Sequence, residues 1–119
     1  MNIISIILTV LVAVLFFYIM YLETFATDSD STSRVFNISK EELKRPNLNT
    51  LFKNQGVYNG LLGVALLYGS FISKNPKEIV GMLLVYIILV AIYGGVTSDK
   101  KIILKQGGLP ILALILLFF

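Results

Sequence analysis

The chain has 119 residues, of which 56% are hydrophobic and only 14% are charged, with a formal net charge of +3. Soluble chains average about 45–50% apolar and about 25% charged residues, so this composition predicts one integral membrane domain over residues 1–119 and excludes a soluble globular domain. The mild charge argues against nucleic acid as a partner, and the absence of cysteine and histidine excludes disulfides and imidazole or thiolate chemistry, so neither a metal nor a cofactor is expected.

Four apolar segments, at about residues 2–23, 49–72, 79–97 and 101–119, predict an all-α, four-helix membrane bundle. The interior of the first segment is interrupted only by Ser5 and Thr9. At 1.5 Å per residue the 21 residues from Asn2 to Leu22 reach about 31 Å, enough to cross a hydrocarbon core of about 30 Å. A signal peptide would start with basic residues and carry a shorter apolar run, so we expect this segment to be retained as a helix.

The connections differ in length and character. The first is long and polar, and Ser39 stands three residues before Glu42, which is the capping-box pattern. We therefore expect a short interfacial helix at about residues 40–45. The second and third connections are short. In the fourth apolar segment Gly107, Gly108 and Pro110 predict a bend, because proline removes an intrahelical hydrogen bond.

Lysine and arginine predict the orientation, since these residues concentrate in cytoplasmic loops. The second connection holds only Lys74 and Lys77. The first and third connections with their flanks hold eight basic residues: Arg34, Lys40, Lys44, Arg45, Lys53, Lys100, Lys101 and Lys105. The bias places these two connections in the cytoplasm and both termini outside, in a multi-pass protein of the cell membrane.

Polar residues occur at one end of each predicted helix, and this orientation places them all in the cytoplasmic leaflet. At 100° per residue the polar side chains of residues 54–59 share one face of the second helix, and Gly56, Gly60 and Gly63 form the adjoining face, suited to close helix packing. Glu23 ends the first helix on the same face as Ser5 and Thr9. The candidate ligand-binding residues are Glu23, Asn54, Gln55, Tyr58, Asn59, Tyr93, Thr97 and Gln106.

Each of these features also has a structural interpretation. Amides in membrane helices often only join one helix to another, and tyrosines at helix ends often lie in the interfacial belt. A carboxylate at the end of a span can lie among headgroups. Acidic groups near a membrane core are nevertheless functional candidates, and Glu23 suits proton exchange, with Lys105 as a candidate counter-charge.

Several segments together resemble a bacterial family of small four-helix membrane proteins, catalogued as domain of unknown function 1304. The similarity rests on "YIMYLETF", "VFNIS", "NQGVYNGLLG", "YGGVT" and "KQGGLPILALIL", and it spans nearly the whole chain. The resemblance implies an integral membrane protein with no assigned activity. Relatives often carry a Glu-His pair where this chain has Leu15 and Phe16, which argues against histidine-based or metal-dependent chemistry here.

Three functions are consistent with these patterns. The first is binding or transport of a small polar or amphipathic molecule, in a cytoplasm-facing pocket centred on Glu23 and the amides of residues 54–59. The second is an intramembrane enzyme for a lipid-like substrate, with Glu23 as acid or base and Tyr58 or Tyr93 as proton donor. The third is a structural or partner-binding subunit. The expected partners are the lipid bilayer, a small-molecule or lipid ligand, and further copies of the chain in a homo-oligomer.

Overall fold

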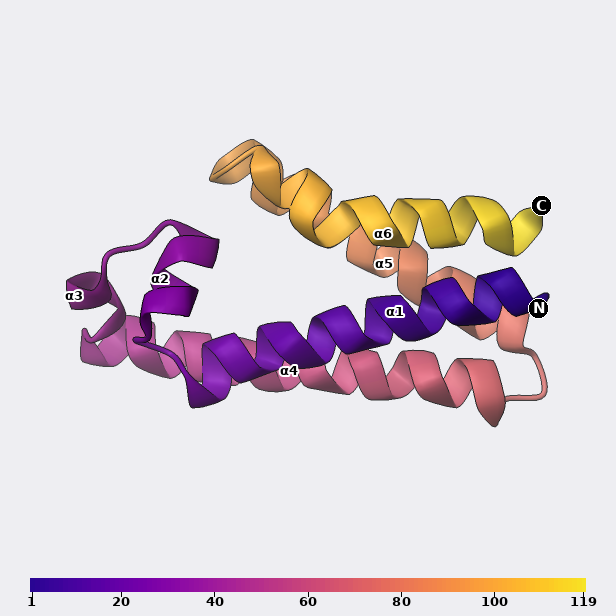
Figure 1. Cartoon of the computed structure of the whole chain (residues 1–119), viewed down its shortest axis with the longest axis horizontal. Helices are drawn as coiled ribbons and strands as arrows, with labels where there is room; N and C mark the ends of the chain where they lie inside the picture. The colour runs from indigo at the N-terminus through magenta and orange to yellow at the C-terminus, as the bar shows by residue number, and fades with distance from the viewer. The chain divides into compact units, whose positions relative to one another are not determined.

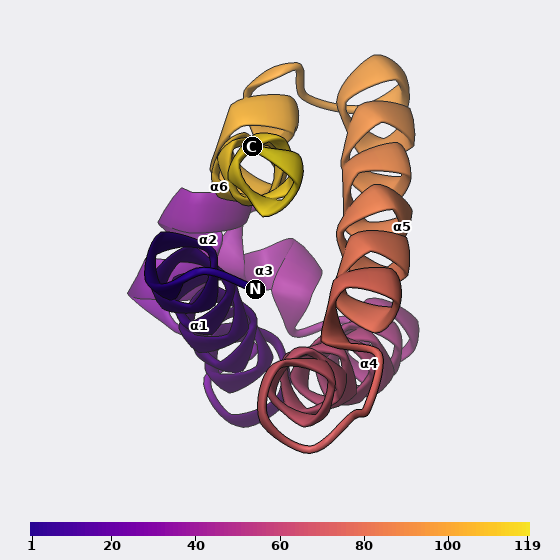
Figure 2. The ribbon, with the colours of Figure 1, turned by 90° about the vertical axis from the view of Figure 1, so that its right-hand side faces the viewer.

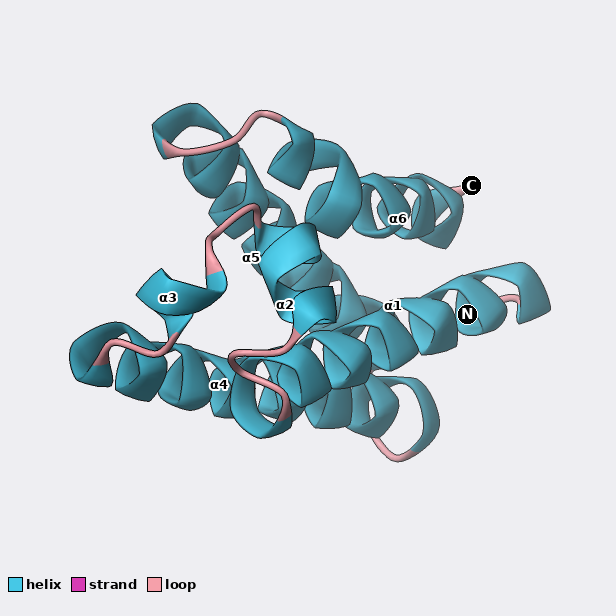
Figure 3. Ribbon diagram, turned by 60° about the vertical axis from the view of Figure 1, so that its left-hand side comes forward, coloured by secondary structure: helices cyan, strands magenta, loops and turns pink.

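A computed structural model describes all 119 residues, and its regular structure is entirely helical (Figure 3). The predicted all-α class is therefore confirmed. The elements in chain order are α1 (Ile3–Met20), the π-helical turn η1 (Tyr21–Phe25), α2 (Asp30–Phe36), α3 (Lys40–Leu43), α4 (Pro46–Phe71), α5 (Pro76–Thr97) and α6 (Lys101–Phe118) (Figure 1).

The sequence predicted four long helices and one short interfacial helix, but the structure has six α-helices, because the first connection holds two short helices rather than one. The helix α3 begins where the capping box predicts it, and the Ser39 side chain accepts a hydrogen bond from the Glu42 amide at 3.2 Å. The additional helix α2 begins at another serine cap, Ser29, and ends at Asn37 in the left-handed conformation. Its seven residues are too few to show a periodic pattern in the sequence.

Three helical segments are both long and apolar enough to cross a membrane: Ile3–Phe25, Pro76–Thr97 and Lys101–Phe118. The fourth long helix, α4, has 26 residues, and its length suffices for a span. Its amides and tyrosines make it less apolar than the other three. Both α4 and α5 begin three residues earlier than expected, at Pro46 and Pro76, because proline is favoured in the first turn of a helix.

The chain forms two compact units, and the helices α1 and α4 contribute to both. The central unit is Val14–Gly63, and the terminal unit is Met1–Ala13 with Val64–Phe119. In the terminal unit α5 and α6 run side by side, joined by a short loop (Figure 2). Pro110 does not end α6, which is continuous from Lys101 to Phe118 and bends between its orange and yellow parts in Figure 1.

Small residues bring α5 and α6 together. A Cβ atom on Gly107 would lie 3.2 Å from the Cβ of Ala91, and one on Gly95 would overlap the Ile103 side chain. Gly107 and Pro110 are both buried, so the weakened part of α6 faces protein. The Ser5 hydroxyl donates to the Leu116 carbonyl at 2.7 Å, which joins the start of α1 to the end of α6 within the terminal unit.

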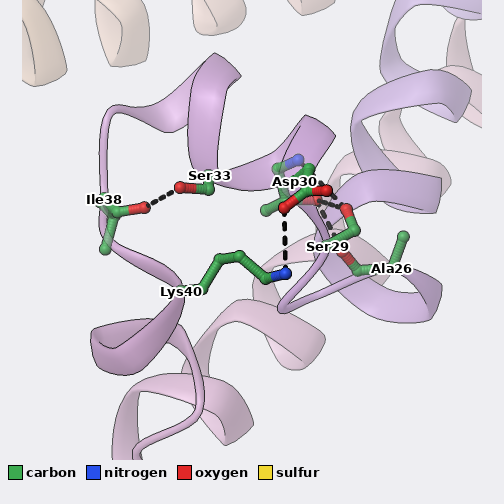
Figure 4. Close-up of polar contacts among 7 residues, drawn as sticks. Ala26, Ser29, Asp30, Ser33, Ile38 and Lys40 are labelled. Carbon is green, nitrogen blue, oxygen red and sulfur yellow. Dashed lines mark hydrogen bonds and ion pairs between the residues drawn. The ribbon is translucent and has the colours of Figure 1, made fainter.

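In the central unit, a side chain of α2 caps the end of the first long helical segment by hydrogen bonding. The hydroxyl of Thr32 lies 2.9 Å from the Leu22 carbonyl and 2.6 Å from the Ala26 carbonyl. These carbonyls stand at the end of a helix, where partners from the same helix are missing. Figure 4 shows the contacts that hold this connection, including the Ser33 hydroxyl on the Ile38 carbonyl at 2.7 Å and the Lys40–Asp30 ion pair at 2.9 Å.

Candidate functional site

The most unusual side chain of the structure is Glu23, an acidic residue of η1 with no exposed surface. Its Oε1 accepts a hydrogen bond from Asn59 Nδ2 at 2.6 Å, and its Oε2 accepts one from Gln55 Nε2 at 2.6 Å. The two amides are four residues apart, so they lie on the same face of α4. One helix therefore supplies one donor to each carboxylate oxygen.

Two glycines let α4 approach the Glu23 backbone this closely. A Cβ atom on Gly56 would overlap the Thr24 hydroxyl and would lie 3.0 Å from the Thr24 nitrogen and 3.1 Å from the Glu23 Cβ. A Cβ atom on Gly60 would overlap the sulfur of Met20. Gly63, the third glycine expected in this packing, is also buried. Because Gly56 and Gly60 alternate with Gln55 and Asn59 along α4, close packing and the carboxylate contacts occur along the same part of the helix.

Hydroxyl groups next to Glu23 fix the turn that carries it. The Thr24 hydroxyl donates to the Lys53 carbonyl at 2.9 Å, which ties η1 to α4. The Thr27 hydroxyl donates to the Glu23 carbonyl at 2.7 Å. The turn η1 itself has a π-helical hydrogen bond from the Ala26 nitrogen to the Tyr21 carbonyl, 2.9 Å long. Such turns cost helical regularity and are frequent at functional sites.

The charge environment of Glu23 is neutral within the central unit. The ion pairs of that unit are Lys40–Asp30 at 2.9 Å and Arg45–Glu42 at 3.4 Å, both on the exposed connection. The carboxylate accepts hydrogen bonds from two amides, and it forms no ion pair with a lysine or arginine of this unit. No three residues among Asp, Glu, His and Cys lie close enough together to hold a metal ion.

The structure brings three of the eight predicted ligand-binding residues together: Glu23, Gln55 and Asn59, which we call the carboxylate–amide cluster. Asn54 and Tyr58 lie on the same half of α4 but are exposed, Tyr58 to 72%. The other three belong to the terminal unit. There Tyr93 is 72% exposed, the Thr97 hydroxyl donates to the Tyr93 carbonyl at 2.8 Å, and Gln106 is half-buried.

The Glu23 carboxylate is enclosed by protein rather than open to a cavity, since it has no exposed surface. Gln55 is exposed as a residue although its amide bonds to Glu23, so this side chain connects the buried carboxylate with the molecular surface. The sequence interpretation omitted Thr24 and Met20, which complete the contact with α4. A hydroxyl directly after the only acidic residue of the apolar segment was the available signal for Thr24.

These features define an all-helical protein with three segments apolar enough to cross a membrane and one buried carboxylate held by two amides. The chain belongs to the family described as "Protein of unknown function (DUF1304)", which it matches over residues 10–118. It is 66% identical over 119 residues, the full length of both chains, to "Uncharacterized protein YpaA" of Lactococcus lactis subsp. lactis (strain IL1403). No solved structure matches the chain.

Proposed function

We propose that the chain is a multi-pass protein of the bacterial cell membrane that crosses the bilayer four times. The four spans are α1 with η1, then α4, α5 and α6, and they form one membrane domain with both termini outside. Three of these spans have the required length and composition. The fourth, α4, is about 39 Å long at 1.5 Å per residue, and two of its side-chain amides each donate one hydrogen bond to Glu23, which lowers the cost of placing them in lipid.

The proposed function is binding or transport of a small polar or amphipathic molecule at the carboxylate–amide cluster, with proton exchange at Glu23. The observation that supports it is the complete burial of a carboxylate whose two oxygens each accept one amide hydrogen bond of 2.6 Å. Ionisable groups inside membrane spans are expensive to bury and mark substrate or proton pathways.

The hydrogen-bond geometry suggests how proton exchange and ligand binding are coupled. An ionised carboxylate only accepts hydrogen bonds, and both amides present donors to it. When Glu23 takes up a proton, one oxygen gains an O–H donor, and an amide that turns offers its carbonyl to that donor. Gln55, which is exposed, is free to turn in this way. The turned amide then presents a different group to a ligand at the surface.

Proton uptake by reconstituted vesicles tests this proposal. We expect a proton flux with the wild-type protein and a loss of at least ten-fold with Glu23→Gln, because the glutamine cannot ionise. The matched control is Glu41→Gln on the exposed helix α3, which should retain the flux. Equal fluxes from wild type and Glu23→Gln would rule out proton exchange at Glu23.

A purely structural role is the second candidate, and the full satisfaction of Glu23 by two amides favours it. The same contact would join η1 to α4 in a subunit without a ligand. Native mass spectrometry separates the two functions, because a binding protein should retain a lipid or metabolite that Glu23→Gln loses. A wild-type protein with no bound mass and no proton flux would favour the structural subunit.

A further inference from the structure

The two amides that hold Glu23 differ in their surroundings, although their hydrogen bonds are equal in length. Gln55 Nε2 and Asn59 Nδ2 each donate to one carboxylate oxygen at 2.6 Å. Gln55 is exposed, whereas Asn59 is half-buried. Glutamine also has one methylene group more than asparagine, and it belongs to the side chains with the most rotamer freedom. Oε2 of Glu23 is therefore bonded to an exposed, flexible side chain, and Oε1 is bonded to a shorter, covered one.

The polarity of α4 changes along its length and marks the Gln55 end of the cluster as the end nearer to water. Lys53 and Asn54, directly before Gln55, are polar and exposed. The hydrogen bond from the Thr24 hydroxyl to the Lys53 carbonyl, which joins η1 to α4 at this end, is itself exposed. After Asn59 the helix continues as "GLLGVALLYG", a run without charged or amide side chains that suits the hydrocarbon layer. Water therefore has its shorter route to the carboxylate on the Gln55 side.

The Asn59 end of the cluster is closed by residues of the central unit itself. Gly60, the next residue of α4, is buried, and a Cβ atom on it would overlap the sulfur of Met20. Gly63, one turn further along the helix, is buried as well. The backbone of α4 is thus packed tightly beyond Asn59. Oε1 of Glu23 therefore stays covered when the Gln55 side chain moves.

We propose that Gln55 is the gate of the Glu23 carboxylate and that Asn59 is the positioning residue that keeps the carboxylate in place. When the gate opens, the Gln55 side chain swings away from η1, water takes its place at Oε2, and Asn59 keeps its bond to Oε1. A proton passes from this water to Oε2. Gln55 then returns with its carbonyl oxygen toward the new O–H donor. The proton as the species that passes rests on the proposed function, whereas the place of the gate rests on the contacts of Gln55 and Asn59.

Chemical modification of carboxyl groups tests where Glu23 is reached from water. A water-soluble carbodiimide, used with glycine ethyl ester on the full chain in membranes, converts the carboxyl groups that it reaches into amides. Mass spectrometry measures the modification of Glu23 relative to that of Glu41, which is exposed on α3 of the same unit. We expect Gln55→Ala to raise this ratio at least five-fold over wild type, and Asn59→Ala to raise it less than two-fold.

The two variants are a matched pair, because each removes one amide and one hydrogen bond of 2.6 Å to the same carboxylate. If the amides only joined η1 to α4, both variants would loosen this contact alike and would expose Glu23 equally. Equal ratios, a larger ratio for Asn59→Ala, or no modification of Glu23 in Gln55→Ala would overturn the proposal.

Proton flux into vesicles provides a second measurement that keeps the length of the gate side chain. Methionine is unbranched and flexible, but it has no amide to bond Oε2 or to lead water there, so Gln55→Met should lower the flux at least five-fold. Val57→Met introduces the same residue on the exposed side of α4, where Val57 is 48% exposed, and should retain the flux. An unchanged flux in Gln55→Met would contradict the gate. A wild-type protein without flux would instead refute proton exchange at Glu23, and the modification ratios would still decide where the carboxylate is reached.

Discussion

At the scale of single residues, the hydrogen bonds to the Glu23 carboxylate in the central unit depend on two glycines of α4. Gln55 and Asn59 reach Glu23 only because the backbone of α4 comes close to η1, and Gly56 and Gly60 permit that approach. The two glycines differ in what stands opposite them. Gly56 faces the backbone and hydroxyl of Thr24, whereas Gly60 faces the end of the flexible Met20 side chain.

This difference predicts an order of stabilities. Gly56→Ala should destabilise the protein by about 1–3 kcal/mol, the usual cost of overpacking, because the Thr24 backbone cannot move without displacing Glu23. Gly60→Ala should cost less, because methionine has flexible rotamers.

Val57→Leu on the exposed side of α4, where Val57 is 48% exposed, serves as the control and should stay within about 0.5 kcal/mol. Thermal unfolding in detergent measures all three variants. A larger effect of Gly60→Ala than of Gly56→Ala would contradict this packing, as would a large effect of Val57→Leu.

At the scale of elements, the short helix α2 packs against the end of η1. Two contacts fix α2 in this position, and they should contribute unequally to stability. One is buried: the Thr32 hydroxyl meets the Leu22 and Ala26 carbonyls, and Thr32 has no exposed surface. The other is the exposed Asp30–Lys40 pair. The hydrogen bond and positive charge of Lys40 lower the pKa of Asp30 below its usual range.

We therefore expect Thr32→Val to destabilise the central unit by about 1–3 kcal/mol, because the isosteric substitution leaves buried carbonyls without their donor. Asp30→Asn should change the unfolding temperature very little, since exposed ion pairs contribute little.

The small contribution of Asp30 should also depend on pH. Because its pKa is lowered in the folded protein, the contribution is present above the ordinary pKa of aspartate and is lost as the pH falls through the lowered value. Unfolding scans of both variants between neutral and strongly acidic pH measure these effects. A greater loss for Asp30→Asn than for Thr32→Val at neutral pH would show that the connection depends on its surface charges.

At the scale of the whole molecule, the proposed topology follows from the distribution of basic residues, with eight around the first and third connections and two in the second. Positive residues are retained on the cytoplasmic side during insertion. The carboxylate–amide cluster adjoins the first connection along the chain, so the topology places it in the cytoplasmic leaflet.

Labelling of single cysteines in intact cells tests the topology. Glu78→Cys, at the second connection, should react with a membrane-impermeant reagent added outside, and Glu41→Cys in the first connection should react only after the cells are opened. Both glutamates are exposed, and acidic residues contribute little to orientation, so neither substitution should itself invert the protein. Labelling of Glu41→Cys in intact cells would reverse the model of orientation.

The sequence alone determined the helical class and the approximate positions of the four long helices, because these follow from hydrophobic patterning along one segment at a time, and its motifs determined the family. It also placed Gln55 and Asn59 on one face, since helical period is a local property. Helix α2 was not predicted from the sequence, because a helix of seven residues capped by Ser29 is too short to show a helical period of hydrophobic residues.

Which polar residues contact one another depends on how the helices pack. Eight residues shared a predicted depth, yet the Glu23 carboxylate is bonded by Gln55 and Asn59, while Asn54 and Tyr58 on the same half of α4 stay exposed. Helical period leaves open which part of a polar face a neighbouring helix covers. Here the π-turn η1 and the glycines of α4 set that choice, because they fix where two backbones approach closely enough for a short amide to reach a carboxylate.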